Sequence, residues 1–375
     1  KNYFYPDLPQ GYQISQYTKP IVGKGSIEID LKDGNSKEIR ITRLHLEQDA
    51  GKSLHDLDPN KTYIDLNRSG IALMEIVSEP DMRSAKEAQE YVRKLRSILR
   101  YIQTCDGNME EGSLRCDVNI SVRKKGEDFG IRCEIKNLNS IKSIGQAIEH
   151  EFNRQIEIIK SGGKVQQETR LFDEKKNETR AMRTKEEEHD YRYFPDPDLP
   201  PLEISDSFVE KIKKDLPELP DIKKKKLIEQ YSISPYESSI LVSDKSNVDF
   251  FEEIIEKNKK RNPKTVAHWI IGDLFSMLNK NNLDIKDSPV TASDLGELLD
   301  LIEDSTISGK LAKTVFEEMF TTRKKPKQII ENKDLKQITD SGEIEKVIVK
   351  ILTENTDKVE QYKSGKEKLY GYFVG

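Results

Sequence analysis

The sequence predicts an α+β fold over about the first 210 residues and an all-helical remainder. Strand-like alternation and helix-like periodicity are mixed in the first part, whereas from Phe208 onward apolar residues recur at the helical period. Between the two, prolines in the segment 191–201 fit neither a helix nor an interior strand. A chain of 375 residues is long enough for two or three domains.

The composition indicates a well-solvated protein rather than one with a single large core. Charged residues make up 34% of the chain and hydrophobic residues 35%. No segment approaches the roughly 18 consecutive apolar residues of a membrane span, and the first residues lack a signal-peptide pattern. We therefore expect a cytoplasmic protein. Its cysteines, Cys105, Cys116 and Cys133, lie too far apart for a metal-binding CxxC pair, so we expect reduced thiols.

A β-hairpin is predicted over residues 27–41, where apolar and acidic residues alternate on both sides of a turn at 33–35. Beyond the hairpin the alternation slips by one position, which predicts a β-bulge near Thr42. The slip makes Leu44 and Leu46 the apolar positions of the continuing strand. Its polar face then carries Arg43, His45 and Glu47.

Two amphipathic helices are predicted in the same region. The first follows Ser84, whose spacing to Glu87 is that of a capping box, and keeps the 3.6-residue period as far as Ile102. The second begins near Ser140 and ends at the glycine pair 162–163. These boundaries place two strands, 114–122 and 131–136, between the helices.

The polar faces of these two strands carry the residue types that bind magnesium and phosphate. They consist of Arg115, Asp117 and Asn119 on one strand, and of Arg132, Glu134 and Lys136 on the other. Asp and Asn are poor strand formers, and short carboxylates beside Arg and Lys suit Mg²⁺ and phosphate groups. A solvated face with cross-strand ion pairs remains the alternative for any one of these residues.

Familiar nucleotide-binding motifs are absent from the sequence. Residues 51–53 read GKS, but the phosphate loop requires a glycine where Leu46 stands, and no G-x-G-x-x-G fingerprint occurs. If ATP binds, it binds to something other than these motifs, such as a sheet face whose carboxylates hold Mg²⁺ against the phosphates. His45 could be a ligand, a base or a satisfied polar residue, and Glu110 and Glu111 could be metal ligands or ordinary loop residues.

Positive charge concentrates toward the C-terminal half although the net charge is -5. Basic runs occur at 211–214, 223–226, 257–264 and 323–327, where they could contact RNA phosphates or only solvate helices. Acidic residues interleave with them, so both interpretations stay open. We expect Trp269 to be a core residue.

Several long motifs identify a family resemblance that covers essentially the whole chain. They are KNYFYPDLP (1–9), YQISQ (12–16), HLEQDAGKS (45–53), DLNRSG (65–70), EIVSEPD (75–81), EEGSLRCDVNIS (110–121), EIKNLNS (134–140), QETR (167–170) and DYRYFPDPDLP (190–200). In this order and spacing they resemble the B subunits of bacterial aspartyl/glutamyl-tRNA amidotransferases.

The resemblance implies a cradle-shaped α+β catalytic domain with a glutamine-synthetase-like sheet over residues 1–210. A helical domain over 211–333 and the start of a tRNA-binding tail domain over 334–375 would follow. In this family an A subunit releases ammonia from glutamine, and a C subunit holds the A and B subunits together. The B subunit uses ATP to phosphorylate the side-chain carboxylate of Glu or Asp mischarged on tRNA(Gln) or tRNA(Asn), and ammonia then displaces phosphate.

The resemblance and the polar strand faces together give a set of expected site residues. We expect Mg²⁺ ligands at Glu47, Asp117 and Glu134, with Glu110, Glu111 and Asp49 as second choices. We expect the ATP phosphates to contact Arg115, Lys136 and Lys52, and the catalytic set to be Arg115, Lys136, Glu134 and Asp117. Many family members carry two adjacent glutamates where this chain has Glu47-Gln48, so Glu47 alone would bind metal there.

The chain lacks an initiator Met and the family's N-terminal Glu and His, and we expect a fragment that is also shortened at its C-terminal end. Two other functions remain open from the sequence. One is a glutamine-synthetase-like ligase acting on a free small carboxylate, and the other is a tRNA-binding scaffold without chemistry. Only the amidotransferase would turn over ATP and also require an aminoacyl-tRNA.

Overall fold

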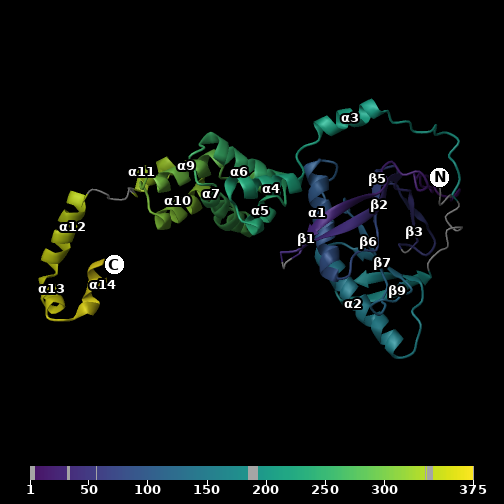
Figure 1. Ribbon diagram of the computed structural model, residues 1–375, viewed down its shortest axis with the longest axis horizontal. Helices are drawn as coiled ribbons and strands as arrows, with labels where there is room; N and C mark the ends of the chain where they lie inside the picture. The colour runs from purple at the N-terminus through teal and green to yellow at the C-terminus, as the bar shows by residue number, and fades with distance from the viewer. Residues whose placement is uncertain are drawn as a thin grey trace. The chain divides into compact units, whose positions relative to one another are not determined.

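The computed structural model describes residues 5–31, 34–55, 57–184, 193–333, 335 and 341–374 (Figure 1). The chain divides into two compact units, 1–219 and 220–375. The strands are β1 (Gly25–Asp30), β2 (Ser36–Gln48), β3 (Lys52–Leu54), β4 (Tyr63–Asp65), β5 (Ala72–Ser78), β6 (Cys116–Ile120), β7 (Cys133–Leu138), β8 (Glu168–Asp173) and β9 (Glu178–Thr184), all in the first unit. Mixed α and β structure there confirms the predicted α+β class.

The predicted hairpin is formed by β1 and β2, which pair antiparallel from Gly25↔Ile41 to Asp30↔Ser36. Part of its turn, residues 32 and 33, lies outside the described residues. The register of β2 shifts between Ile41 and Arg43, which confirms the predicted bulge near Thr42. Beyond the bulge β2 pairs with β5, so the first sheet has the order β1-β2-β5. A short separate sheet joins β3 to β4.

The second sheet has the order β6-β7-β8-β9. β7 and β8 are parallel, and helix α2 (Ile141–Lys160) supplies the crossover between them. Along β6 the residues alternate in exposure, so that Asp117 and Asn119 lie on the open face as predicted. On β7, Cys133 and Ile135 are buried while Glu134 and Lys136 stay partly exposed. The pleat of β7 therefore points both charged side chains away from the core.

Both predicted helices are present. α1 spans Ala85–Tyr101, and the Ser84 hydroxyl accepts a hydrogen bond from the Glu87 backbone N–H as an N-cap should. The Glu87 carboxylate does not close the predicted capping box. It accepts instead from Lys37 and from the Arg83 backbone N–H, at 2.7 Å each. α2 ends at Lys160, and Gly162, just beyond the C-cap Ser161, adopts a φ of +78°.

The core of the first unit lies where α1 and α2 meet the two sheets. α1 packs against α2 and β1, and α2 packs against β6, β7 and β9. The buried side chains come from every one of these layers, and each large one stabilises the fold by roughly 1.5–3 kcal/mol before the entropy cost. They are Ile29, Ile39, Tyr91, Val92, Met109, Ile135, Leu138, Ile144, Ala147 and Phe172. This core fixes the sheets so that their polar faces can form a site.

The remaining helices follow the sheets in the chain. They are α3 (Asp206–Asp215), α4 (Pro220–Tyr231), α5 (Pro235–Leu241), α6 (Lys245–Lys257), α7 (Pro263–Trp269), α8 (Phe275–Lys280), α9 (Ala292–Glu303), α10 (Gly309–Thr322), α11 (Pro326–Lys333), α12 (Ser341–Glu354), α13 (Thr356–Lys363) and α14 (Tyr370–Val374), with a π-helical turn at Ile270–Leu274. Trp269 is buried against Phe316 in the core of the second unit, as predicted. None of the described helices combines the length and apolar character needed to cross a lipid bilayer.

Candidate active site

Three side chains that can bind a metal ion meet on β2 and β5. The antiparallel register places Glu75 directly opposite His45. Nε2 of His45 lies 2.9 Å from Oε1 of Glu47 and 3.5 Å from Oε2 of Glu75. One ligand atom from each of these residues lies within 4.8 Å of the other two. We call this group the carboxylate–histidine cluster.

The N-terminal segment shelters the cluster. Ser15 Oγ and Gln13 Nε2 each donate a hydrogen bond of 3.0 Å to the Glu47 carboxylate, and Ser15 also bridges to Glu47 through the backbone. The edge of the Tyr17 ring packs on the His45 ring at a centroid distance of 6.3 Å. As a result His45 is 0% exposed.

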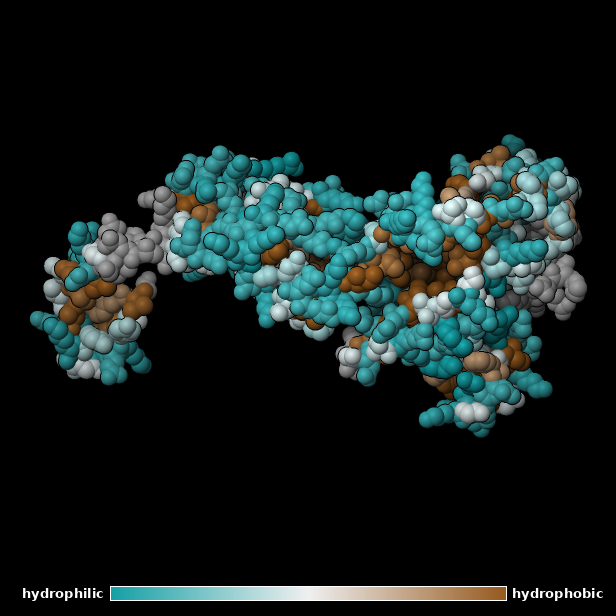
Figure 2. Space-filling model, turned by 45° about the horizontal axis from the view of Figure 1, so that its top comes forward, coloured by the Kyte–Doolittle hydropathy of each residue, from teal (hydrophilic) through white to brown (hydrophobic). Residues whose placement is uncertain are grey.

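Beyond the bulge at Thr42, the two faces of β2 are exposed in the opposite sense to that expected of an amphipathic strand. Leu46 is 37% exposed and Met74, its partner on β5, is 40% exposed, whereas His45 is buried. The predicted alternation of leucines with polar residues along this part of β2 is confirmed. The polar face, however, is the one shielded from solvent. Apolar side chains elsewhere on the first unit are exposed as well, and Figure 2 shows brown patches on its surface. A strand normally buries its apolar face, so a sheltered polar face points to chemistry there.

Electrostatics favour a cation in the carboxylate–histidine cluster. Burial, followed by the negative charge of Glu47, raises the pKa of Glu75 above its ordinary value, although His45 opposes the shift. Two carboxylates that repel each other in a partly buried place are stabilised by a divalent cation, and carboxylate oxygens are ligands that Mg²⁺ prefers. Nε of Arg43 donates to Nδ1 of His45 at 3.4 Å, which leaves the proton of a neutral imidazole on Nε2, facing Glu47. Glu47 and Glu75 therefore fit a divalent cation best, and His45 orients Glu47.

A second charged group lies on the open face of β6 and β7. Nζ of Lys136 lies 2.5 Å from Oδ2 of Asp117 and 3.5 Å from Oε1 of Glu134. The Thr169 hydroxyl of β8 donates to Glu134 at 3.1 Å. Burial lowers the pKa of Lys136, but the negative charges of Asp117 and Glu134 outweigh it and raise the pKa overall. Lys136 is therefore held as a cation between two carboxylates.

The two groups are electrostatically connected. The charge of Asp117 makes a small contribution to the raised pKa of Glu75, after burial and the charge of Glu47. Asp49, just past the end of β2, accepts hydrogen bonds from Nε of Arg68 at 2.7 Å and from Nη2 of Arg115 at 2.9 Å. The site thus combines a carboxylate pair for a cation with several guanidinium and ammonium groups for anions. That combination suits the transfer of a phosphoryl group.

Comparison with known proteins decides the family. The model of the GatB/GatE catalytic domain matches residues 1–210, and the model of the GatB domain matches residues 249–375. The B subunits of the aspartyl/glutamyl-tRNA(Asn/Gln) amidotransferases from Pelagibacter ubique and Acidiphilium cryptum are each 59% identical over the whole chain, which spans 76% of either relative. The relative of the same name from Rhodospirillum rubrum is 57% identical, with 77% of its length covered. The chain belongs to the GatB family.

Within this GatB-family chain the structure brings three of the predicted site residues into one group and places the others apart from it. Asp117, Glu134 and Lys136 form one group, and Glu47 lies in the carboxylate–histidine cluster. Arg115 is exposed and paired with Asp49. Asp49, with two guanidinium partners, is a poor candidate for a metal ligand. Glu110 and Glu111 are exposed in the turn before β6, and Lys52 is exposed on β3, outside the two larger sheets.

Sequence reasoning missed two residues that contact the two charged groups, Glu75 and Thr169. Glu75 stands out in the sequence only as part of the EIVSEPD motif, and Thr169 only as part of QETR. One signal could have found Glu75. It is a single glutamate among the apolar residues of β5, just as His45 is a polar residue between two leucines of β2. That pattern shows a polar position but not its partner, because the pairing of β2 with β5 is a long-range contact.

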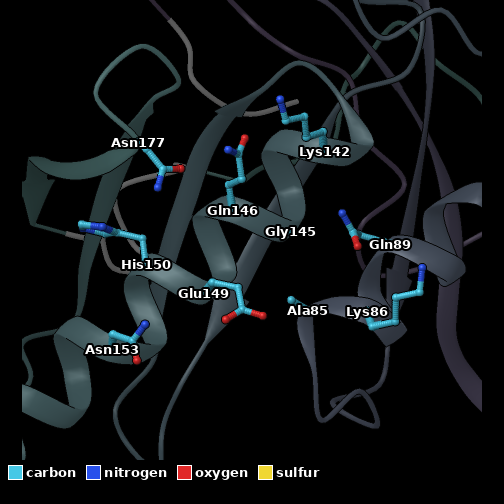
Figure 3. A pocket seen from close by; sticks show the side chains of 10 residues that line it. All are labelled: Ala85, Lys86, Gln89, Lys142, Gly145, Gln146, Glu149, His150, Asn153 and Asn177. Atoms are coloured by element: carbon cyan, nitrogen blue, oxygen red, sulfur yellow. The ribbon is translucent and has the colours of Figure 1, made fainter.

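A groove of about 550 Å³ lies elsewhere on the first unit, between α1 and α2. Figure 3 shows Gly145 of α2 facing the Gln89 side chain of α1 across it. A Cβ at Gly145 would come within 2.4 Å of Gln89 Nε2, which donates to the Ile141 carbonyl at 2.9 Å. The small residue thus lets the two helices approach each other. The groove contains none of the residues of the two charged groups, and we assign it no role.

Proposed function

We propose that this chain catalyses the ATP-dependent step of tRNA-dependent transamidation. The substrate is Glu or Asp mischarged on tRNA, and the products are Gln-tRNA or Asn-tRNA, ADP and phosphate. The observation that carries the proposal is the presence of two charged groups, the carboxylate–histidine cluster on β2 and β5 and the group of Asp117, Lys136 and Glu134 on β6 and β7. The ion pair of Arg115 with Asp49 links the residue before β6 to the residue after β2. The names of the relatives agree with this activity.

The reaction needs the side-chain carboxylate of the substrate to attack the γ-phosphate of ATP. A carboxylate is a weak nucleophile, so its approach must be aligned and the charge that develops on the phosphoryl oxygens must be balanced. Mg²⁺, when bound, would supply part of that balance by offsetting the charge on the phosphate oxygens. In this chain Glu47 and Glu75 would hold the cation, and Asp117 on β6 of the second sheet adds to the negative charge acting on Glu75.

The cationic side chains have the complementary role. Lys136 stays protonated between Asp117 and Glu134, so its ammonium is placed at a fixed position on the sheet face. Arg115 is exposed and anchored by Asp49, which leaves further guanidinium donors for phosphate oxygens. The substrate carboxylate and ammonia must then meet at the same face, where ammonia attacks the acyl carbon and phosphate leaves.

The finer features of the family are part of the same proposal. We assign the first 210 residues to a cradle-like catalytic domain with a glutamine-synthetase-like sheet, residues 211–333 to a helical domain and 334–375 to a tail domain that contacts tRNA. Ammonia would come from a glutaminase A subunit, with a C subunit joining the two. Support for an assembly of several subunits comes from the relatives, whose names make each of them the B subunit of an amidotransferase.

The test measures ADP release by the assembled enzyme with three carboxylate substrates. These are Glu-tRNA(Gln), Asp-tRNA(Asn) and free glutamate, each with ammonium as nitrogen donor. ADP release that requires a mischarged tRNA supports the proposal. Release with free glutamate alone would identify a small-substrate ligase instead, and no release under any condition would favour a scaffold. Buffer without divalent cation provides the control for the cation.

A further inference from the structure

Two tyrosines far apart in the sequence stack beside the carboxylate–histidine cluster. The rings of Tyr17 and Tyr193 are stacked, with centroids 5.2 Å apart and an angle of 16° between their planes. The Arg43 guanidinium lies over the Tyr17 ring, 4.7 Å from its centroid. We call these three residues the aromatic stack. Each pair of the stack contributes on the order of 1 kcal/mol, in addition to the free energy gained from burying apolar surface.

The stack contacts the cluster directly. Tyr17 packs its edge on His45, and Arg43 donates a hydrogen bond to the same imidazole. The segment around Tyr17 is fixed to β2 by backbone hydrogen bonds, from Gln16 N–H to the Leu46 carbonyl at 3.1 Å and from Val22 N–H to the Leu44 carbonyl at 3.1 Å. Tyr17 therefore cannot move without disturbing β2 at the cluster.

Tyr193 ties a second segment to the same place. It is the first described residue of the proline-rich stretch, in which the Asp196 side chain accepts from the Asp198 N–H at 2.9 Å and the Leu199 N–H reaches the Asp196 carbonyl. This turn, with prolines on both sides of Asp196, limits the conformations of the stretch. The stack is thus the contact through which a stiff segment from the end of the catalytic domain reaches the cluster.

We propose that Tyr17 and Tyr193 are positioning residues that protect the activated carboxylate from water. This inference rests on the proposed function. Transfer of the γ-phosphoryl group to the side-chain carboxylate releases ADP and forms an acyl phosphate. Ammonia attacks its acyl carbon, the bond to the phosphate oxygen breaks, and a proton is lost to give the amide. Attack by water breaks the same mixed anhydride and restores the carboxylate, so ATP is consumed without product. Exclusion of water from such a site favours the first outcome.

The experiment measures how much ADP is released for each amide formed. It uses the assembled enzyme, Glu-tRNA(Gln) or Asp-tRNA(Asn), and ammonium in place of glutamine, so that glutaminase activity does not enter. In Tyr193→Ala and Tyr17→Ala we expect the ratio of ADP to amide to rise at least about threefold. Tyr193→Phe and Tyr17→Phe keep the rings and should keep the wild-type ratio. Tyr63→Ala is the matched control, because Tyr63 on β4 is 42% exposed and Tyr193 is 40% exposed.

A structural role alone would lower ADP release and amide formation together, which leaves their ratio unchanged. An unchanged ratio in both alanine variants would overturn the inference. Where Tyr193→Ala fails to fold, Tyr193→Leu replaces it, since leucine keeps apolar volume but cannot stack. Failure of the wild-type enzyme to release ADP in a tRNA-dependent way would instead refute the proposed function itself.

Discussion

Nε2 of His45 lies 2.9 Å from Oε1 of Glu47, and the imidazole is fully buried on the strand face opposite Leu46. A buried, oriented carboxylate with a second carboxylate beside it is expensive to maintain without a cation. In the proposed site, Glu47 is therefore the residue on which cation binding should depend most. Glu75, rather than Glu134, is the second ligand that we propose.

Glu47→Gln should reduce tRNA-dependent ADP formation by about 100-fold or more, because the amide removes the negative charge that holds the cation. The fold should survive, since the amide oxygen can still accept from Ser15. The matched control is Glu38→Gln, an exposed glutamate of the same strand, which should leave the rate unchanged. The measurement is a steady-state rate at several Mg²⁺ concentrations, with thermal unfolding as the check on folding. A Glu47→Gln enzyme of wild-type rate would exclude this residue as a ligand.

The raised pKa of Glu75 predicts that the free energy of unfolding depends on pH. Burial and the charge of Glu47 raise its folded pKa above the unfolded value, so the protonated carboxyl is favoured in the folded state. The resulting stability is fully present below the unfolded pKa and is lost as the pH rises through the folded pKa. In buffer free of divalent cations, Glu75→Gln should therefore become the more stable protein toward neutral pH. Because the Glu75 side chain is half exposed, screening limits the gain to roughly 0.5 kcal/mol.

Added Mg²⁺ should reverse this order, because a cation that binds only the folded state stabilises the wild-type protein more than the variant. Unfolding midpoints measured across the pH range, with and without Mg²⁺, check both statements. If the unfolding midpoints of wild type and Glu75→Gln differed by the same amount at every pH, with and without Mg²⁺, the assignment of Glu75 to the cation site would be contradicted.

Lys136→Met should lower ADP formation by about 100-fold or more, since it removes the cation held between Asp117 and Glu134. Lys136→Arg keeps the charge but not the compact ammonium, and we expect it to recover only part of the activity. Lys125→Met, in the exposed loop between β6 and β7, is the control.

Asp117→Asn and Glu134→Gln should likewise abolish activation while the fold is kept. Activity in both of these carboxylate variants would contradict the assignment of the second charged group.

Asp81 should contribute to stability above its ordinary pKa. Arg40 donates to its Oδ2 from the backbone N–H and Nε and to its Oδ1 from Nη2, at 3.0, 2.9 and 2.6 Å. These hydrogen bonds lower the pKa of Asp81 to about 2. A depressed pKa gives stability that is present above the unfolded pKa and is lost as the pH falls through the folded pKa.

Asp81→Asn should therefore cost about 1 kcal/mol at neutral pH, a figure reduced by the exposure of the Arg40 side chain. The difference from wild type should shrink as the pH falls from 3.8 toward 2. Urea unfolding at a series of pH values measures it. A difference that stays constant with pH would mean that the pair does not act through its charge.

Local patterns predicted β1, β2, β6 and β7 and the helices α1 and α2, but not β3, β4, β5, β8 or β9. The slip in alternation at Thr42 is visible in the sequence, and so are the Ser84 and Ser140 N-caps and the glycine that ends α2. The side chains of Asp117, Glu134 and Lys136 were also found from alternation, because the period of a strand fixes which residues share a face.

What the sequence could not supply are contacts that depend on tertiary register. Pairing of His45 with Glu75 follows from the antiparallel alignment of β2 with β5, and local periodicity carries no information about it. The same holds for Tyr17 and Tyr193, which are far apart in the sequence and stack only in the folded structure. The sheltered polar face of β2 was missed for this reason, because its cover comes from segments distant in sequence.

The most direct test of acyl-phosphate formation follows the side-chain oxygen of the substrate. Glu-tRNA(Gln) or Asp-tRNA(Asn) labelled with heavy oxygen in the side-chain carboxylate is converted by the assembled enzyme with ATP and ammonium, and the released phosphate is analysed by mass spectrometry. Activation through an acyl phosphate predicts that label appears in the phosphate in step with amide formation. Amide formed while the phosphate stays unlabelled would contradict the central claim that ATP phosphorylates the carboxylate.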